Sequence, residues 1–453
     1  MKKIKKNMII VLIVMLITMM LFFFSPYKYQ KQIVNLFPDF VEKNVRYVLN
    51  GIYNNLPEKI KYSLHLLGLE EKLWVSKNDK ITINSLKNDY NVKFLPETQF
   101  LKLKFLKKKL FDNNNNQILN TRHLDFFDGD KLVVSNLDGS LLITEINKDK
   151  IFKQEKLIAK KIDLNIKFSL TDIFIDDDQL YLSYYEKKEA CNYFNILNLN
   201  LKSLSSKVFF SSDECIEESP GGGRIQKITH NGSDGLLVTT GGYILNQPNL
   251  KPMDNNSIMG KTLFFDFETK NKITFSRGHR NPQGLFFDKQ NQIILSTEHG
   301  PQGGDEINKI EFGKNYGWPL SSYGKKYDHK FFYFKGKKID PNKIDENLRY
   351  KKSHEDFGYQ EPIFAFVPSI GISEIIKIPN DFSVKWQDNY FVTSLMDNSL
   401  YRVKFSKNFD KIIFNEKIFI GQKIRDIKFN KKEKFFILSL QDKSELGFLF
   451  AEK

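Results

Sequence analysis

The chain has few of the residues that reveal a function by their number alone. Its 453 residues include only two cysteines, three tryptophans and seven histidines. Two cysteines exclude a disulfide-rich scaffold. In an exported protein an even count favours a disulfide between Cys191 and Cys215 over two separate buried thiols. Closing a loop of about two dozen residues would stabilise the fold by about 3 kcal/mol.

The chain also lacks an Arg-rich helix and any nucleic-acid motif, although it is basic. Its 69 Lys and Arg against 54 Asp and Glu give a net charge of +15. The lysines are scattered along predicted strands and turns, which is typical of a solvated surface. We therefore expect no nucleic-acid partner.

A cleavage site is missing after the hydrophobic N-terminus. Four lysines precede an apolar run, Met8–Phe24, whose only polar residue is Thr18. That run is at the short end of what spans a bilayer. Ser25-Pro26-Tyr27 is a poor cleavage sequence, which favours an uncleaved signal anchor over residues 1–27 rather than a cleaved signal peptide. The lysines would stay cytoplasmic, placing the globular part in the periplasm, anchored at a bacterial inner membrane.

Residues 28–90 show helical periodicity and predict a helical spacer between the anchor and the main domain. From residue 91 to 453 an apolar stretch, an Asp/Asn/Gly turn and a short strand recur. The strand cores begin at Leu132, Leu180, Leu236, Ile293, Tyr390 and Phe435. All but one of the spacings suit one blade, and the long one carries a polar, Lys-rich insertion from about 320 to 360. The domain is therefore predicted to be an all-β, six-bladed β-propeller; a β-sandwich would not repeat at this period.

Glycines, carboxylates and amides crowd into the segment from Gly278 to Pro319, which contains Gly-His-Arg-Asn-Pro-Gln-Gly, Glu-His-Gly-Pro-Gln-Gly-Gly-Asp-Glu-Ile-Asn and Asn-Tyr-Gly-Trp-Pro. This block resembles the pyrroloquinoline quinone (PQQ)-dependent soluble sugar dehydrogenases, the glucose/sorbosone and aldose sugar dehydrogenase group. Shorter similarities lie at 221–225, 322–328, 367–370 and 424–427, so the resemblance covers the chain from about residue 95. The family fold is also a six-bladed propeller.

The resemblance implies a cofactor and metal site. PQQ is a tricarboxylate quinone, so its pocket needs cations, hydrogen-bond donors and a Ca²⁺ with oxygen ligands. By resemblance, Arg280 faces the quinone oxygens, and Asn281, Gln283 and Asp305 belong to the same pocket. The carbonyls of Gly300 and Pro301 hold the cofactor Ca²⁺. Glu306 and the Tyr316 carbonyl serve a second, structural Ca²⁺.

The sequence departs from the family pattern at three places. Pro220 stands where the family has its catalytic histidine, and proline cannot accept a proton. The stretch around Lys167-Phe168 lacks the family's Gln/Gly-Gly pattern, and Met396-Asp397 offers no basic group for the PQQ carboxylates. His299, beside Gly300, is the candidate substitute base.

Two functions follow. The first is periplasmic, PQQ- and calcium-dependent oxidation of an aldose sugar or related alcohol, with electrons passed to an acceptor that the sequence does not identify. The alternative is a non-catalytic propeller that binds a carbohydrate or a partner protein through a calcium-stabilised central pocket. Pro220 and Met396-Asp397 favour the alternative.

Overall fold

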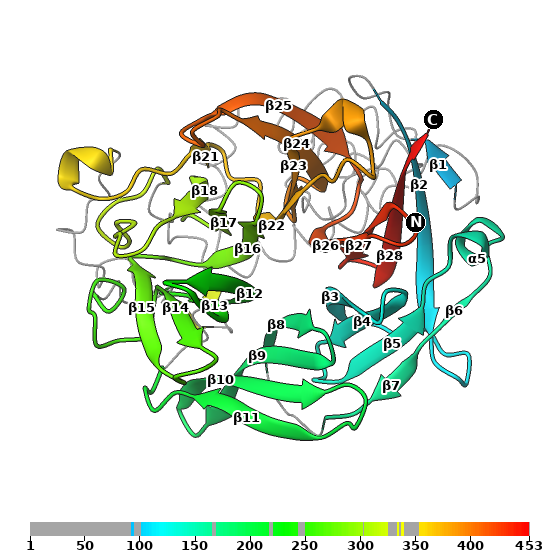
Figure 1. The fold of residues 1–453 in the computed structure, drawn as a ribbon, viewed down its shortest axis with the longest axis horizontal. Coiled ribbons are helices and arrows are strands. Elements are labelled where there is room, and N and C mark those ends of the chain that lie inside the picture. The colour runs from blue at the N-terminus through cyan, green and yellow to red at the C-terminus, as the bar shows by residue number, and fades with distance from the viewer. Residues whose placement is uncertain are drawn as a thin grey trace, which may run out of the picture. The chain divides into compact units, whose positions relative to one another are not determined.

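The computed structural model is an all-β propeller whose blades surround a central axis (Figure 1). It describes residues 101–164, 169–216, 221–242, 250–301, 303–324 and 353–452, and the backbone of 92–94, 333–334 and 337–338. The propeller belongs to a compact unit, Tyr90–Lys453. The predicted anchor and spacer lie outside the described residues. Within the described part, no helix is long and apolar enough to cross a membrane.

Six sheets form the blades. The innermost strands are β3 (Thr121–Phe127), β8 (Ser169–Asp176), β12 (Gly222–His230), β16 (Pro282–Asp288), β22 (Ile372–Lys377) and β26 (Ile424–Asn430). The second strands are β4 (Lys131–Asn136), β9 (Gln179–Lys188), β13 (Ser233–Thr240), β17 (Ile293–Glu298), β23 (Asn389–Ser394) and β27 (Phe435–Leu440). The third strands are β5 (Leu141–Glu145), β10 (Cys191–Asn200), β14 (Lys261–Asp266), β18 (Asp305–Ile310), β24 (Ser399–Phe405) and β28 (Glu445–Glu452). The fourth strands are β7 (Lys160–Ile162), β11 (Ser206–Ser211), β15 (Lys272–Arg277), β21 (Phe364–Phe366), β25 (Ile412–Phe419) and β2 (Lys102–Phe111).

Short elements complete the described part: β1 (Val92–Phe94), β6 (Leu157–Ile158), β19 (Tyr333–Phe334), β20 (Lys337–Lys338), the helix α5 (Lys148–Phe152) and two 3₁₀ turns, Glu355–Phe357 and Val384–Trp386. All six strand cores predicted from the sequence fall in second strands. The prediction of a six-bladed propeller is confirmed. Most of the predicted insertion, 320–360, lies outside the described residues.

The ring closes between the two ends of the propeller domain. β2 pairs antiparallel with β28, from Lys102 opposite Glu452 to Lys109 opposite Glu445. The first long strand of the chain therefore becomes the outer strand of the last blade. This pairing joins the ends of the domain through main-chain hydrogen bonds, so the inner strands form a closed circle.

The second strands are buried on both faces because each blade packs between two neighbours. All six residues of β23 and of β27 are buried. A cluster between the fifth and sixth blades shows the packing, with Phe391 and Leu400 against Phe436 and Leu438. Such strands appear in the sequence as continuous apolar runs instead of alternating ones, which is why their repeat was visible.

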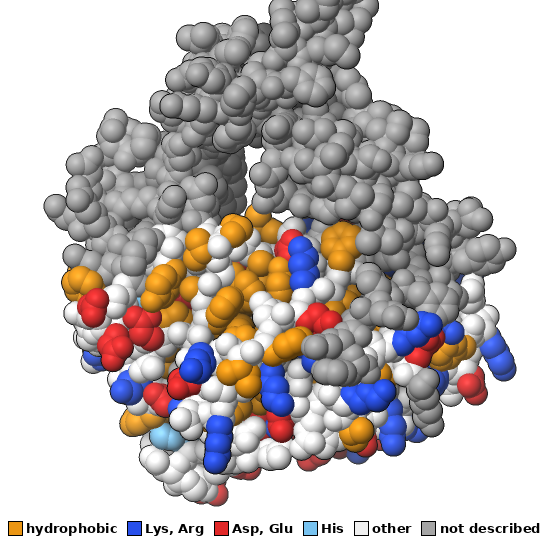
Figure 2. Space-filling model, turned by 90° about the horizontal axis from the view of Figure 1, so that it is seen from above, with side chains coloured by type: hydrophobic (Ala, Val, Ile, Leu, Met, Phe, Trp, Pro, Cys, Tyr) orange, Lys and Arg blue, Asp and Glu red, His pale blue; other side chains and the backbone are white. Residues whose placement is uncertain are grey.

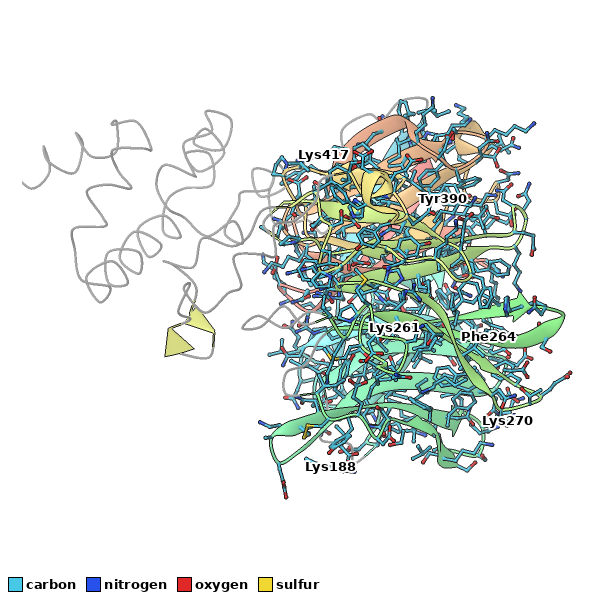
Figure 3. All side chains as sticks on the ribbon, turned by 90° about the vertical axis from the view of Figure 1, so that its left-hand side faces the viewer. Lys188, Lys261, Phe264, Lys270, Tyr390 and Lys417 are labelled. Atoms are coloured by element: carbon cyan, nitrogen blue, oxygen red, sulfur yellow. A yellow bond between two sulfur atoms is a disulfide. The ribbon has the colours of Figure 1, made fainter. Side chains whose placement is uncertain are left out.

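Most lysines lie at the surface, but Lys261 does not. On the face in Figure 2, positive and negative side chains of the described residues are interspersed. In Figure 3, Lys188 and Lys270 lie at the periphery, whereas Lys261 lies inside. The Lys261 ammonium donates to the carbonyls of Lys251 at 2.8 Å, Pro252 at 3.1 Å and Met259 at 2.6 Å. Burial lowers the pKa of Lys261 to about 8. These bonds attach the 250–260 loop to β14, beside the Gly278–Pro319 block.

Cys191 and Cys215 form a disulfide, with their Cα atoms 5.0 Å apart. The bond links the start of β10 to the segment after β11, where Asn192 and Ile216 also pair. It closes a loop of 24 residues in sequence separation at the rim of the second blade.

We expect the double variant Cys191→Ser/Cys215→Ser to lose about 3 kcal/mol of unfolding free energy, because the unfolded chain regains the entropy of the open loop. Urea unfolding of the variant and of the oxidised and reduced wild type measures this loss. Equal stability of oxidised and reduced wild type would contradict the prediction.

Candidate functional site

Every inner strand carries an irregularity at the same place in its pairing with the second strand. The register shifts between Thr121 and Leu124, Leu170 and Asp172, Gly222 and Ile225, Pro282 and Gly284, Ile372 and Ile375, and Ile424 and Asp426. A bulge adds a residue and re-aims side chains. Here the six bulges encircle the axis and point polar groups into the central channel.

Five of the bulges place an ionisable side chain in one buried ring: His123, Asp172, Arg224, Glu374 and Asp426. The sixth has Gly284, where an added Cβ would lie 2.8 Å from the Glu374 carboxylate. The absence of a side chain at 284 therefore leaves room for the Thr297 hydroxyl, the Ser373 carbonyl and the Glu374 carboxylate.

Arg224 is the centre of the ring. Its Nη1 lies 2.9 Å from Asp172 Oδ1, 3.2 Å from Glu374 Oε2 and 3.8 Å from Asp426 Oδ2. Its Nε donates to the Gln283 carbonyl and its Nη2 to the Arg425 carbonyl at 3.3 Å. One guanidinium thus compensates the charge of three buried carboxylates. Buried carboxylates need such a partner because an isolated charge in the interior is very costly.

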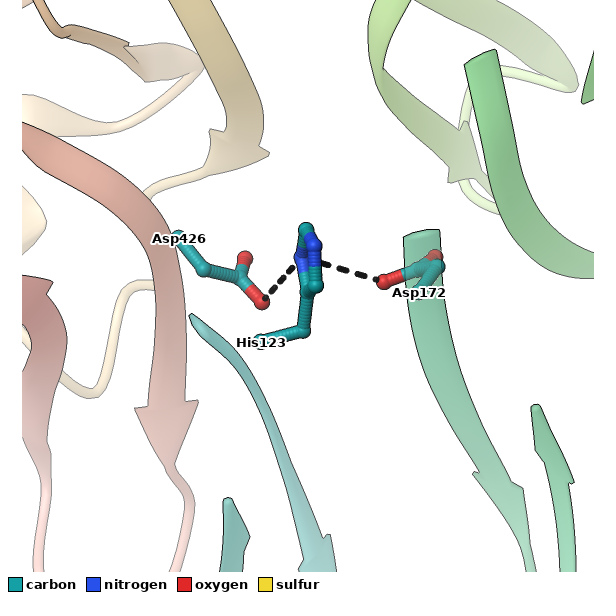
Figure 4. Close-up of side chains that lie close together, drawn as sticks. All are labelled: His123, Asp172 and Asp426. Atoms are coloured by element: carbon teal, nitrogen blue, oxygen red, sulfur yellow. Dashed lines mark ion pairs between the residues drawn. The ribbon is translucent and has the colours of Figure 1, made fainter. Parts of the chain in front are cut away.

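His123, Asp172 and Asp426 have the residue types and spacing of a metal site (Figure 4). The His123 Nδ1 is 3.5 Å from Asp172 and 3.7 Å from Asp426. However, the same Nδ1 is 2.9 Å from Arg224 Nη1. The guanidinium already supplies the positive charge at this point, so we assign no metal here.

The buried environment shifts the pKa values of several residues in this charged ring. Burial, and next the charge of Arg224, lower the pKa of His123 to about 4. Burial raises the pKa of Glu374 to about 7 although Arg224 opposes the shift. Arg224 and His123 outweigh burial at Asp426 and hold its pKa well below the usual range. His123 is therefore neutral at pH 7, with Nδ1 accepting a hydrogen bond from Arg224.

The channel carboxylates also satisfy the open edges of the inner strands. Asp172 accepts from the Ile225 N–H at 2.9 Å, Asp426 from Leu124 at 2.8 Å and Asp125 from Ile175 at 2.7 Å. In each pair the acceptor comes from one blade and the donor from the next. The acids thus connect adjacent inner strands that form no ladder with each other.

The loops of the Gly278–Pro319 block before β16 and after β17 lie at one end of the channel, called the mouth below. Arg280 is buried and lies 5.2 Å from the Trp318 ring. Its Nη1 donates to the carbonyls of His299 at 2.8 Å and Gly300 at 2.7 Å. The Gly300 carbonyl, expected to bind Ca²⁺, therefore already faces a guanidinium.

Asn281, Gln283 and His299 lie together near this mouth. Gln283 Nε2 donates to Asn281 Oδ1 at 2.8 Å, and Asn281 Nδ2 is 3.5 Å from His299 Nδ1. Burial lowers the pKa of His299, with Arg425 and Arg280 acting in the same direction and Asp305 against them. Its buried Nε2 has no hydrogen-bond partner among the described residues.

Asp305 joins the fourth and fifth blades. Its carboxylate accepts from Gly300 N–H at 3.2 Å, the Ser369 hydroxyl at 2.9 Å, Ile370 N–H at 3.1 Å and Ile372 N–H at 2.9 Å. All four contacts are within the chain, so in this arrangement Asp305 positions the loops around Gly300 and Pro301.

Glu306 faces a second glutamate. Glu298 and Glu306 are directly opposite each other in β17 and β18. Burial, and next the charge of Glu298, raise the pKa of Glu306 well above its usual range. The His354 Nε2 is 3.7 Å from Glu306, and the Tyr316 ring stacks on His279 at 4.6 Å. Glu298 already lies 3.1 Å from the His279 Nδ1, and the oxygens of the two carboxylates are candidate donors for a cation.

The sequence reasoning missed two arginines. Arg122 and Arg425 occupy the same bulge position as Gln283, one residue before the charged ring. Arg425 donates to Gln283 Oε1 at 2.8 Å and to Gln441 Oε1 at 3.0 Å. Burial, and next the charges of Arg122 and Arg224, lower the pKa of Arg425 to about 9. The Arg122 Nε is buried without a hydrogen-bond partner among the described residues. The sequence signal for them was weak, because the equivalent position of the six inner strands holds Arg122, Thr171, Gly223, Gln283, Ser373 and Arg425.

The three departures from the family pattern have different positions. Pro220 and 167–168 lie outside the described residues. Asp397 pairs with Lys417 at 2.8 Å and accepts from the Tyr401 hydroxyl. Its charge is thus already compensated within the fifth blade.

The family model for glucose/sorbosone dehydrogenase matches residues 119–447. The chain belongs to this family. The aldose sugar dehydrogenase YliI of Escherichia coli is 32% identical over 174 residues, covering 38% of this chain and 42% of that protein. The quinoprotein glucose dehydrogenase B of Acinetobacter calcoaceticus is 40% identical over 84 residues, covering 16% and 17%. The chain thus aligns with less than half the length of these relatives.

Solved structures of this family share the fold. The apo form of the soluble E. coli aldose sugar dehydrogenase has a TM-score of 0.55 at 20% identity, covering 77% of this chain and 99% of that one. The PQQ-bound aldose sugar dehydrogenase of Streptomyces coelicolor has a TM-score of 0.51 at 17% identity, covering 79% and 100%. The resemblance of the whole propeller to these dehydrogenases is therefore shown.

We expect His123 to make the protein acid-sensitive. Its pKa of about 4 in the folded state lies below the ordinary 6.5, so the unfolded chain takes up the proton first as the pH falls. The wild type should lose about 3 kcal/mol of unfolding free energy between pH 6.5 and pH 4 that His123→Gln does not lose. Urea unfolding of both proteins across this range checks the difference. Parallel pH profiles would contradict it.

Proposed function

We propose that this family member is a PQQ- and calcium-dependent dehydrogenase that oxidises an aldose sugar or related alcohol. The observation that carries the proposal is the basic mouth of the channel. Arg122 is close enough to lower the pKa of Arg425, and the buried Arg122 Nε has no hydrogen-bond partner among the described residues. Such a cluster needs an anion, and the carboxylates of PQQ have the right chemistry.

The residues at this mouth fit the cofactor's polar groups. Arg122, Arg425 and Gln283 would hold its carboxylates, and Asn281 and Arg280 would lie beside the quinone. PQQ would supply a two-electron acceptor. Because Arg280 donates to the Gly300 carbonyl at 2.7 Å, a Ca²⁺ on Gly300 and Pro301 requires this guanidinium to move.

The structural Ca²⁺ has a better-supported place at Glu306. Glu298 and Glu306 oppose each other in adjacent strands, and the Glu298 carboxylate also accepts from the Arg280 N–H. A cation between the two carboxylates, completed by the Tyr316 carbonyl, would remove their repulsion and connect the metal to the loop that carries Arg280.

His299 is the residue we propose as the base. Its lowered pKa keeps it neutral at pH 7, and a neutral imidazole has one ring nitrogen that can accept a proton from a sugar hydroxyl. With this assignment, His299 would take the role of the family's histidine, whose place we expect Pro220 to occupy.

The remaining predictions also belong to this proposal. We infer that residues 1–27 anchor the protein in a bacterial inner membrane and that the propeller works in the periplasm. The apolar run after four lysines and the disulfide between Cys191 and Cys215 support this location.

The alternative is a propeller that binds a carbohydrate or a partner protein without catalysis. Pro220 and the engagement of Arg280 with the Gly300 carbonyl favour it. The two functions differ in one measurement, the binding of PQQ.

With PQQ and Ca²⁺ the purified protein should show a saturable 1:1 change in quinone absorbance and reduce a dye when aldoses are added. Arg425→Met should weaken PQQ binding roughly 10- to 100-fold, the value of a charge-assisted hydrogen bond. His299→Gln should keep PQQ affinity and lose about 10²- to 10⁴-fold in turnover. Lys270→Met removes an exposed charge at the periphery, in the turn between β14 and β15 (Figure 3), and should change neither. If PQQ does not bind, the dehydrogenase proposal is wrong and the non-catalytic alternative stands.

Calcium should stabilise the protein through Glu306. Millimolar Ca²⁺ is expected to raise the thermal midpoint of the wild type, whereas Glu306→Gln should respond less. Without Ca²⁺ the variant should be the more stable protein, because two facing carboxylates no longer repel. Thermal unfolding with and without chelator measures this, with the exposed Glu268→Gln as matched control. An equal Ca²⁺ response in both variants would exclude the site.

A further inference from the structure

The channel has a cavity of about 400 Å³ at the end opposite the basic mouth. Residues of all six inner strands line it, together with Gly129 and Lys431. These two lie in the turns that follow β3 and β26, whereas Asn281 and His299 lie where β16 begins and β17 has ended. The Arg224 ring separates the cavity from the mouth, so the two sites are distinct.

The lining combines charges of both signs with aromatic walls. Asp125 and Glu374 supply carboxylates, and Lys428 and Lys431 supply ammonium groups. Gln226 adds an amide, and the apolar part of the wall combines Phe126, Phe286 and Phe429 with five Ile and Leu residues. The charges balance, so the lining does not select an ion of one sign.

Several of these polar groups have hydrogen-bonding capacity left. The Asp125 oxygens accept from Ile175 N–H at 2.7 Å and Phe126 N–H at 2.9 Å, and each retains a second lone pair. Lys428 is half-buried, and its Nζ donates no hydrogen bond to any described residue. Burial opposes its charge, but Asp125 and Asp426 hold its pKa above the usual range. A charged donor and carboxylate acceptors thus meet in one cavity.

We propose that this cavity binds a neutral, polyhydroxylated small molecule, a monosaccharide or polyol. Such a ligand offers hydroxyl donors to Asp125 and Glu374 and hydroxyl acceptors to Lys428 and Gln226. Its C–H faces can pack on the phenylalanine rings. The volume lies within the range of small-molecule pockets. A ligand with one net charge would meet a group of the same sign on the opposite wall.

This site does not depend on the proposed dehydrogenase activity. No residue of the basic mouth lines the cavity, and the ligand would contact the Arg224 ring only through Glu374. Occupancy should therefore occur in protein without PQQ and should survive substitutions at the mouth.

The test is binding of D-glucose, D-xylose and myo-inositol to the cofactor-free protein, by saturation-transfer NMR and calorimetry. At least one should bind with a Kd of roughly 1–10 mM. Lys428→Met and Gln226→Leu should each weaken this binding about tenfold or more, the value of one or two hydrogen bonds. Gln226→Leu changes no charge, so it still tests the site if the Lys428→Met variant fails to fold.

Two controls locate the binding. Lys432→Met removes an exposed ammonium next to the rim, and Gln283→Leu alters the basic mouth; both should bind as the wild type does. No binding by any of the three compounds at roughly 100 mM, or equal binding by Gln226→Leu and wild type, would overturn the proposal. If D-glucosamine or D-gluconate bound tenfold more tightly than D-glucose, the proposed neutral ligand would be wrong and a charged ligand would replace it. Failure of PQQ to bind would leave this result unaffected.

Discussion

The pairing of Arg224 with three buried carboxylates is the interaction on which the centre of this propeller depends. Inner strands of a propeller have one edge without a ladder partner, and their N–H groups face a narrow channel. Asp172 and Asp426 satisfy two of these groups, and that places negative charge where water is scarce. Without Arg224 those acids and Glu374 would have no direct cation, at a cost of several kcal/mol.

The ring divides the channel into two environments. On one side, Arg122 and Arg425 concentrate positive charge beside the loops of the Gly278–Pro319 block. On the other, Asp125 and Lys428 share a cavity with phenylalanine walls. The same six bulges produce both, because each re-aims neighbouring residues toward the axis. A family scaffold thus presents different chemistry at its two ends without a change of fold.

The sequence predicted the blades well because of burial. Second strands such as β23 and β27 are covered on both faces, so their apolar runs recur at blade spacing regardless of the surface residues around them. The candidate site was less predictable. Arg280 was expected to face a cofactor but donates to the carbonyls of His299 and Gly300 in the loop after β17, and Asp305 bonds to a neighbouring blade. Arg122 and Arg425 are about 300 residues apart in sequence, and no local pattern connects them.

The sequence alone established the number of blades and the family block, and it predicts that Pro220 occupies the place of the family's histidine. These are local properties, encoded in runs and motifs of a few residues. Only the tertiary structure decided which charges meet. Closing the ring through β2 and β28 brings β3, β8, β12, β22 and β26 to one axis. Whether an arginine there is a ligand-binding group or the partner of three acids depends on distances between blades, which no stretch of sequence contains.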